Sequence, residues 1–144
     1  MSLIIIITYV ICVGAVAGGA GNDGNVDAVR SWVASGADIN VVDERGVTPL
    51  MVASGWQRAE CVAEMLRLGA DARRVDNDGW TALHWVAGRG DDGGGAEVVR
   101  LLVAAGCDSG VRTNSGYTVV ELAHLGGRTK WGREVEGWVA AAMA

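Results

Sequence analysis

The sequence predicts an all-α solenoid of about four stacked helix-turn-helix units, and three observations lead to this fold class. A phrase of ten residues with an internal glycine recurs at 41–50, 74–83 and 111–120. A second phrase, Gly-Ala-Asp or Gly-Cys-Asp, recurs at 36–38, 69–71 and 106–108, and both phrases keep intervals of 33 and 37 residues. Apolar residues at helical spacing precede the second phrase each time. Such a period is typical of units that bury their apolar faces only by stacking.

The second unit, which begins at residue 41, shows the signals of the first helix most clearly. Residues 43–46, Asp-Glu-Arg-Gly, form a turn signature in which the glycine can adopt a positive φ. Thr48 is predicted to cap a short helix over residues 50–54. Pro49 suits the first helical position because that position needs no N–H donor.

The second half of the unit contains a second helix. Its predicted apolar stripe is Ala59, Val62, Met65 and Leu66. Gly69 is expected to end this helix in a left-handed conformation, and Asp71 is expected to bond the amides of the loop that follows. Both helices are too short to be stable alone, so stacking must stabilise them.

The other units repeat this second helix. The predicted stripes are Val26, Val29, Trp32 and Val33 in the first unit, Ala96, Val99, Leu102 and Val103 in the third, and Trp131, Val135, Trp138 and Val139 in the fourth. The stripe of the fourth unit is displaced by about one turn, which suits an atypical terminal unit. Trp32, Trp131 and Trp138 are therefore expected in the core, and Trp85 is expected to pack.

The predicted domain organisation is an apolar segment at residues 1–14 followed by a repeat domain at 15–144. The four units are expected at 15–40, 41–73, 74–110 and 111–144, with the first helix of unit 1 at about residues 15–21. Unit 3 carries four additional residues within 91–95, between its two helices, and a surface loop of this kind costs little stability.

Composition restricts the classes of function. The chain has 144 residues, enough for one sizeable core, and its net charge of −5 argues against a nucleic-acid partner. Three cysteines, Cys12, Cys61 and Cys107, show no metal-ligand spacing, which suggests reduced thiols in a reducing compartment such as the cytoplasm. Cys61 lies in an apolar stripe and is expected to be a buried hydrophobic residue, and Cys107 is expected to be structural.

The repeated phrases resemble ankyrin repeats. The resemblance is carried by Gly-Val-Thr-Pro-Leu at 46–50, by Gly-Trp-Thr-Ala-Leu-His at 79–84 and by the Gly-Ala-Asp exits, and it covers roughly residues 15–144. It implies an L-shaped stack of helix pairs with β-hairpin-like loops projecting at one edge. It also implies protein binding, without catalysis or cofactor. The histidine of the family pattern is present only as His84, with Met51 and Glu121 in its place elsewhere. In the family this histidine bonds within the turn, so His84 is interpreted as structural.

The same resemblance predicts where another protein would bind. Ligands of such stacks usually contact the hairpin tips and the face of the first helices. The candidate partner-binding residues are Glu44, Arg45, Val47, Trp56, Asn77, Asp78, Trp80, Arg89, Asn114, Ser115 and Tyr117. Trp80 and Tyr117 stand at equivalent tip positions, and aromatic residues are favoured interface anchors. The alternative is that Trp80 packs on neighbouring hairpins.

Residues 1–22 carry no charged side chain, and four interpretations of them remain open. The segment could be a cap or remnant of the stack, a membrane span over about residues 3–20, a secretory signal, or a mis-assigned start or truncated end of the chain. A membrane span would make the chain a membrane-anchored scaffold, which is the alternative to a cytoplasmic recognition module.

The sequence offers no residue set for an enzyme. The pattern G-x-G-x-x-G at 19–24 follows a strand-like run, but a dinucleotide site needs a longer crossover helix and a second parallel strand. A short helix and a repeat follow instead. His84 and His124 with the three cysteines lack zinc spacing, and no nucleophile motif is present. We therefore expect no catalytic, cofactor or metal site.

Overall fold

The computed structural model describes residues 26–89, 94–125 and 128–143. Within these ranges every regular element is a helix, which confirms the predicted all-α class. The helices are α2 (Val26–Ala34), α3 (Pro49–Gly55), α4 (Ala59–Arg67), α5 (Ala82–Arg89), α6 (Gly95–Ala104), α7 (Val119–His124) and α8 (Thr129–Met143). The first helix expected for unit 1 and the apolar segment 1–14 lie outside the described residues.

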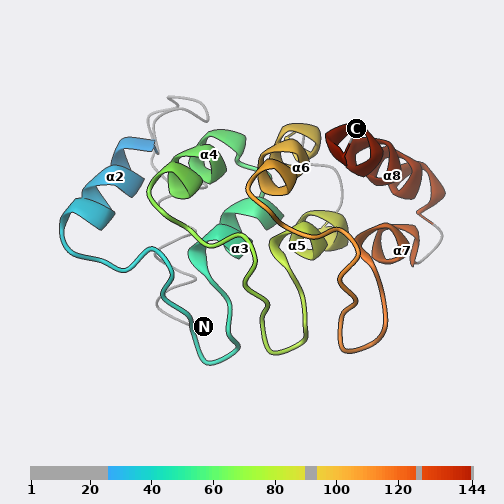
Figure 1. Cartoon of the computed structure of the whole chain (residues 1–144), viewed down its shortest axis with the longest axis horizontal. Helices are drawn as coiled ribbons and strands as arrows, with labels where there is room; N and C mark the ends of the chain where they lie inside the picture. Colours follow the sequence, from blue (N-terminus) through green and yellow to red (C-terminus); the bar gives the residue numbers. More distant parts are fainter. Residues whose placement is uncertain (1–25, 90–93, 126–127, 144) are drawn as a thin grey trace.

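The helices form two layers (Figure 1). The short first helices, α3, α5 and α7, lie next to the loops that project from the lower edge, and the second helices form the other layer. Contacts run from α3 to α5 to α7 in the first layer and from α2 through α4 and α6 to α8 in the second. Each unit therefore packs on its sequence neighbours, as the repeat period predicted.

Threonine hydroxyls begin the first helices. The Thr48 hydroxyl accepts the N–H of Met51 at 3.3 Å, and the Thr118 hydroxyl accepts that of Glu121 at the same distance. Gly69 follows α4 with φ of +101°, and the N–H of Ala70 donates to the carbonyl of Met65 at 2.9 Å. These contacts confirm the predicted N-terminal cap and glycine stop, and they satisfy backbone groups that helix ends leave free.

The second helices bury most of the predicted stripe. Val62 and Met65 of α4 are fully buried, and Cys61 beside them is buried as expected. In α6 the predicted stripe is wrong at one position, because Ala96 is exposed whereas Val98 is fully buried. Val98 stands 37 residues after Cys61, which is also fully buried, whereas Ala96 stands 37 residues after Ala59, which is only half-buried.

The tryptophans of the second helices divide into two groups. Trp131 is buried, and its indole N–H donates to the carbonyl of Ala87 at 2.8 Å, which ties α8 to α5. Trp138 and Trp32 were expected in the core but are only half-buried, packed against its edge. They lie on helices whose outer surface faces solvent, so their large rings are covered on one side.

One carboxylate joins α2 to α4, the second helices of units 1 and 2. Glu64 of α4 accepts hydrogen bonds from Arg67 in the same helix and from Arg30 of α2, the Nε atoms of both arginines lying 3.0 Å from Oε1. These two guanidinium groups, Arg67 first, lower the pKa of Glu64 to about 2. The stability that this ionised group contributes is therefore present above the ordinary glutamate pKa and is lost as pH falls towards 2.

Replacing Glu64 with glutamine should loosen α2, because the contact between Arg30 and the carboxylate crosses from unit 1 to unit 2. Hydrogen exchange of the α2 amides should become faster while exchange in α6 stays unchanged. The matched control is Glu97→Gln, since Glu97 pairs with Arg100 inside α6 and links no two units. Equal protection of α2 in both variants would contradict this role of Glu64.

Two further findings concern residues singled out in the sequence. Cys61 and Cys107 are free and buried, and burial raises the pKa of the Cys107 thiol. Among the described residues, no helix combines the length and apolar character needed to span a bilayer. The apolar run at residues 3–20 is not part of that description.

Candidate functional site

Three equivalent hairpin loops form the lower edge of the molecule. They span residues 43–47, 76–80 and 113–117, and in each the first residue donates its N–H to the carbonyl of the last, at 3.2, 3.0 and 2.9 Å. Each contains one glycine with positive φ, at position 46, 79 or 116. The glycines are required there because side chains disfavour this conformation. We call these loops the first, second and third hairpins.

A side chain at the start of each hairpin fixes its shape. One carboxylate oxygen of Asp43 accepts the N–H groups of Arg45 and Val47, both at 2.9 Å. Asp76 makes the same two bonds in the second hairpin. In the third, the hydroxyl of Thr113 accepts the N–H of Tyr117 at 3.2 Å. The hairpins are thus held by side chains of their own sequence.

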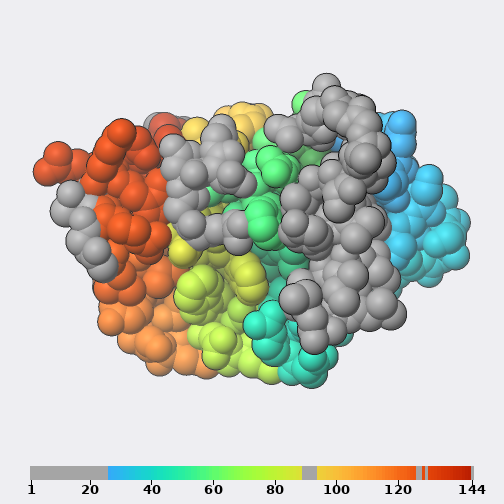
Figure 2. Space-filling model, turned by 180° about the vertical axis from the view of Figure 1, so that it is seen from behind, coloured from blue at the N-terminus to red at the C-terminus, as the bar shows by residue number. Residues whose placement is uncertain are grey.

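Neighbouring hairpins are bonded to one another. Asn77 donates its backbone N–H to the carbonyl of Arg45 at 2.8 Å and its side-chain amide to the carbonyl of Glu44 at 3.0 Å. Asn114 repeats both bonds on the second hairpin, to the carbonyls of Asp78 at 2.9 Å and Asn77 at 2.8 Å. Seen from behind, the three hairpins lie side by side along one edge (Figure 2). The edge is therefore a connected row.

Most of the predicted tip residues face solvent. The side chains exposed along the row are Glu44, Arg45, Asn77, Asp78, Asn114 and Ser115. Trp56, Trp80 and Tyr117 are half-buried. Asn77 and Asn114 also connect the hairpins, a structural role that sequence reasoning did not assign to them.

One predicted partner-binding residue, Val47, does not belong to this surface. Val47 is only 1% exposed and forms part of the core, so the expectation that it contacts a partner is wrong. Its side chain is short enough to be enclosed, whereas Trp80 and Tyr117 at the equivalent positions are not. Arg89 ends α5, and its side chain lies outside the described residues.

Trp80 packs on the helix that follows its own hairpin. A Cβ at Gly88 would lie only 2.7 Å from the ring of Trp80, so the absence of a side chain at Gly88 makes room for the indole. The ring also meets Trp85 edge to face, with centroids 6.1 Å apart. Trp80 thus has a packing role together with a partly accessible ring.

Trp85 connects the second hairpin to α3. Its indole N–H donates to the second carboxylate oxygen of Asp76 at 3.2 Å, and its ring lies against Gly55. Among the described residues the equivalent oxygen of Asp43 has no hydrogen-bond partner, because Val52 stands at the position equivalent to Trp85. Its cation neighbour is Arg45, whose Nε lies 3.8 Å away. Sequence reasoning predicted packing for Trp85 and missed its bond to Asp76.

His84 is structural, as interpreted from the sequence. It is fully buried, and its Nδ1 accepts the N–H of Thr81 at 3.1 Å. Its Nε2 lies 3.0 Å from the carbonyl of Tyr117, which can only accept, so Nε2 carries the proton and the ring is neutral. Burial lowers the pKa of His84, and the bond to Tyr117 partly opposes this effect. The histidine thus joins the third hairpin to α5.

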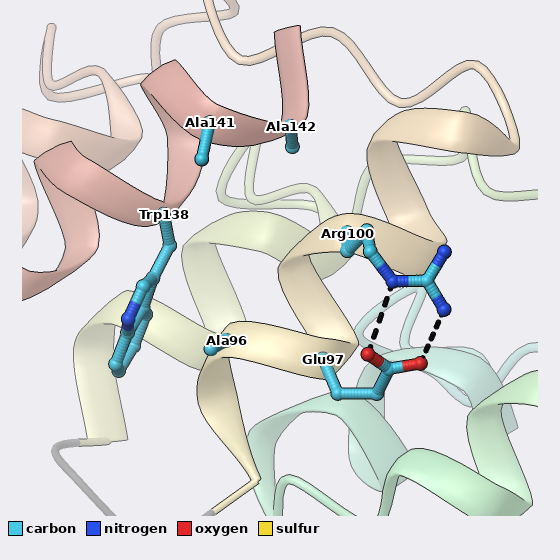
Figure 3. A pocket seen from close by; sticks show the side chains of 6 residues that line it. All are labelled: Ala96, Glu97, Arg100, Trp138, Ala141 and Ala142. Carbon is cyan, nitrogen blue, oxygen red and sulfur yellow. Dashed lines mark hydrogen bonds and ion pairs between the residues drawn. The ribbon is translucent and has the colours of Figure 1, made fainter. Parts of the chain in front are cut away.

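A second surface feature lies between α6 and α8, in the layer away from the hairpins. It is a hollow of about 260 Å³ with Trp138 on one side and the Glu97–Arg100 ion pair on the other (Figure 3). Three alanines complete it: Ala96, Ala141 and Ala142. No predicted partner-binding residue lies there, and the sequence pattern did not predict this hollow.

In the ranges that the structure describes, no group of three or more His, Cys, Asp or Glu side chains is placed to hold a metal ion. The chemistry available on the hairpin row is hydrogen bonding, charge and aromatic contact.

Comparison with known proteins gives a consistent result. A family model described as ankyrin repeats (3 copies) matches residues 16–113 and 60–130. The probable E3 ubiquitin-protein ligase XBOS34 of Oryza sativa subsp. japonica is 34% identical over 122 residues, covering 83% of this chain and 23% of that protein. Ankyrin repeat and SOCS box protein 3 of Bos taurus is 29% identical over 97 residues, which cover 65% of this chain and 18% of the length of that protein. The chain thus spans less than a quarter of the length of either relative.

Proposed function

Since this chain belongs to the ankyrin-repeat family, whose repeats are generally protein-interaction modules, we propose that it binds another protein through the hairpin row and the adjacent face of the first helices. The module acts without catalysis. The ligase activity in the name of the rice relative is a property of that protein, of which this chain covers 23%.

The observation that carries this proposal is the connected row of exposed tips. Six exposed polar or charged side chains stand on three hairpins whose backbones are bonded to each other. Because the hairpin backbones are already bonded to one another, binding a partner costs the module little backbone conformational freedom. Half-buried Trp80 and Tyr117 add aromatic surface beside the polar groups, a combination that is favoured at interfaces.

The first-helix face extends the proposed surface. Trp56 follows α3 directly and is half-buried, and Arg89 ends α5, so both stand at the ends of first helices. A partner lying along the row would reach these helix ends as well as the tips. The net charge of −5 favours a protein partner over a nucleic acid.

Charge reversal at the tips should weaken binding. In the variant Glu44→Lys with Asp78→Lys, both changes fall on exposed side chains of the row. Affinity capture from a lysate of the native host, followed by mass spectrometry, should show proteins that the intact chain retains and this variant loses. The variant should melt like the intact chain, since exposed substitutions usually change stability by less than about 0.5 kcal/mol.

The matched control places the same charge change elsewhere. Asp27→Lys with Glu136→Lys alters two exposed carboxylates on α2 and α8, away from the row. This control should capture the same proteins as the intact chain. If tip and control variants lose the same proteins to the same extent, the hairpin row is not the binding surface.

A further inference from the structure

The three hairpins differ at the position just before the tip glycine. This residue is Arg45 in the first hairpin, Asp78 in the second and Ser115 in the third, and all three side chains are exposed. Because the hairpins share the same internal backbone bond, these side chains leave the row at equivalent places. At this position the second hairpin presents a negative charge where the first presents a positive one.

Each outer hairpin has a guanidinium group beside it. In the first, the Nε of Arg45 lies 3.8 Å from the carboxylate of Asp43. In the third, Arg112 donates to the carbonyl of Gly116 at 2.7 Å and also pairs with Glu121. The chain itself therefore supplies a positive charge to both outer hairpins.

The second hairpin lies between these two and lacks such a cation (Figure 1). Within the described residues, no ion pair involves Asp78. The two arginines that precede this hairpin contact other groups. The Nε of Arg74 lies 3.9 Å from the carboxylate of Asp71, and the guanidinium group of Arg73 lies against Gly106. The exposed carboxylate of Asp78 thus has no described cation in contact with it.

Two tryptophan rings lie beside the second hairpin. Trp80 and Trp85 meet edge to face, with ring centroids 6.1 Å apart and planes at 74°, and both residues are half-buried. The equivalent residues of unit 2 are Val47 and Val52, which are buried. An accessible indole face attracts cations because the face of an aromatic ring carries negative charge density. The second hairpin therefore combines aromatic surface with a carboxylate.

Hydrogen bonds hold the carboxylate position and the rings in one arrangement. One oxygen of Asp76 accepts the N–H groups of Asp78 and Trp80, both at 2.9 Å. The other oxygen accepts the indole N–H of Trp85 at 3.2 Å. In the first hairpin, Arg45 extends to 3.8 Å from the oxygen that is equivalent to this second one. A side chain that leaves position 78 in the same direction therefore points towards the two rings.

We propose that the second hairpin binds an arginine side chain of the partner, with the guanidinium group stacked on the accessible part of Trp80 and bonded to the carboxylate of Asp78. This inference rests on the proposed function and specifies its chemistry. Arginine suits the site better than lysine, because its planar group can stack on an indole and donate to a carboxylate at the same time. The partner thus supplies the guanidinium group that the outer hairpins receive from their own chain.

The test uses short peptides that differ in one side chain. They are acetyl-glycyl-Xaa-glycine amides with arginine, lysine or citrulline in the middle, because citrulline has the shape of arginine without its charge. Each is titrated at millimolar concentration and low salt into the isotope-labelled intact chain while the NMR shifts of amide and indole N–H groups are recorded. The arginine peptide should shift the indole signal of Trp80 and the amide signal of Asp78.

The other two peptides should bind more weakly. The citrulline peptide should lose about tenfold in affinity, because it makes neither the cation–π contact nor the ion pair. The lysine peptide should lose about threefold, because its ammonium group cannot stack. Absence of a shift at Trp80, or equal binding of the arginine peptide and either of the others, would overturn the arginine site.

Two matched variants complete the test. Asp78→Asn removes the charge of an exposed side chain on the second hairpin, and Glu44→Gln does the same on the first, where buried Val47 replaces the indole. Asp78→Asn should weaken binding of the arginine peptide about threefold, whereas Glu44→Gln should leave it unchanged. Equal effects of the two variants would also overturn the arginine site.

The captures with the tip-charge variant test the proposed function separately. Proteins lost by that variant, together with no response to the arginine peptide, would overturn the arginine site and leave the proposed function in place. A response to the arginine peptide, together with equal captures by the tip and control variants, would overturn the proposed function alone.

Discussion

Replacing His84 with alanine is expected to lower the free energy of unfolding by about 3 kcal/mol, because a buried side chain and its hydrogen bonds are lost together. His84 is fully buried and joins the N–H of Thr81 to the carbonyl of Tyr117. The alanine variant leaves both backbone groups without this partner and leaves a cavity between units 3 and 4. Urea unfolding at neutral pH measures the loss.

The matched control for this variant is His124→Ala. The His124 side chain is 36% exposed, and its Nε2 lies 3.7 Å from a carboxylate oxygen of Glu136, beyond hydrogen-bond distance. Its removal should cost less than about 1 kcal/mol, as expected for a partly exposed side chain. If the two variants lose similar stability, His84 does not join units 3 and 4 as the structure indicates.

The same contacts make the stability dependent on pH. Burial lowers the pKa of His84, so the unfolded chain takes up a proton more readily than the folded chain below the ordinary histidine pKa of about 6.5. The stabilising effect of neutral His84 is complete above that pH and declines as pH falls towards the lower pKa of the folded state. His84→Met should remove this decline, because methionine does not titrate. The variant should still fold, since Met51 at the equivalent position accepts the N–H of Thr48 through sulfur at 3.5 Å.

Sequence reasoning predicted the fold because every unit carries its own local signals. Thr48 begins α3 and Gly69 ends α4 through bonds to residues a few positions away, so the pattern alone locates them. The buried position of Val98 was also within reach. It stands 37 residues after Cys61, which was already placed in the core, whereas Ala96 was taken as the equivalent of Ala59, which is itself only half-buried.

The candidate site was harder to predict because it depends on contacts between units. The recurrence of asparagine at 77 and 114 was visible, but its bonds to the preceding hairpin require that the loops lie side by side. Exposure cannot be transferred between equivalent positions either. Val47 is enclosed and Trp80 is half-buried, because residue size and the neighbouring unit decide what remains accessible.

Replacing Gly79 with alanine is expected to destabilise the chain by about 3 kcal/mol, which combines two separate costs. The first is backbone strain, since Gly79 has φ of +78° and an alanine pays about 1 kcal/mol there. The second is collision, since the new methyl group would lie 2.7 Å from the side-chain oxygen of Asn114 and 2.9 Å from its backbone nitrogen. Asn114 must then move and lose its bonds to Asp78 and Asn77, worth about 1 kcal/mol each.

The variant Gly116→Ala separates these two costs. Gly116 has φ of +91°, similar to that of Gly79, but nothing lies within 4 Å of the position of its Cβ. Its loss should therefore be the strain alone, about 1 kcal/mol, measured by urea unfolding of both variants. Only Gly79→Ala should also speed the hydrogen exchange of the Asn114 amide, which donates to Asp78. Equal losses in the two variants would mean that the bonds between hairpins add no stability, and the row of tips would then not be held in place by Asn114.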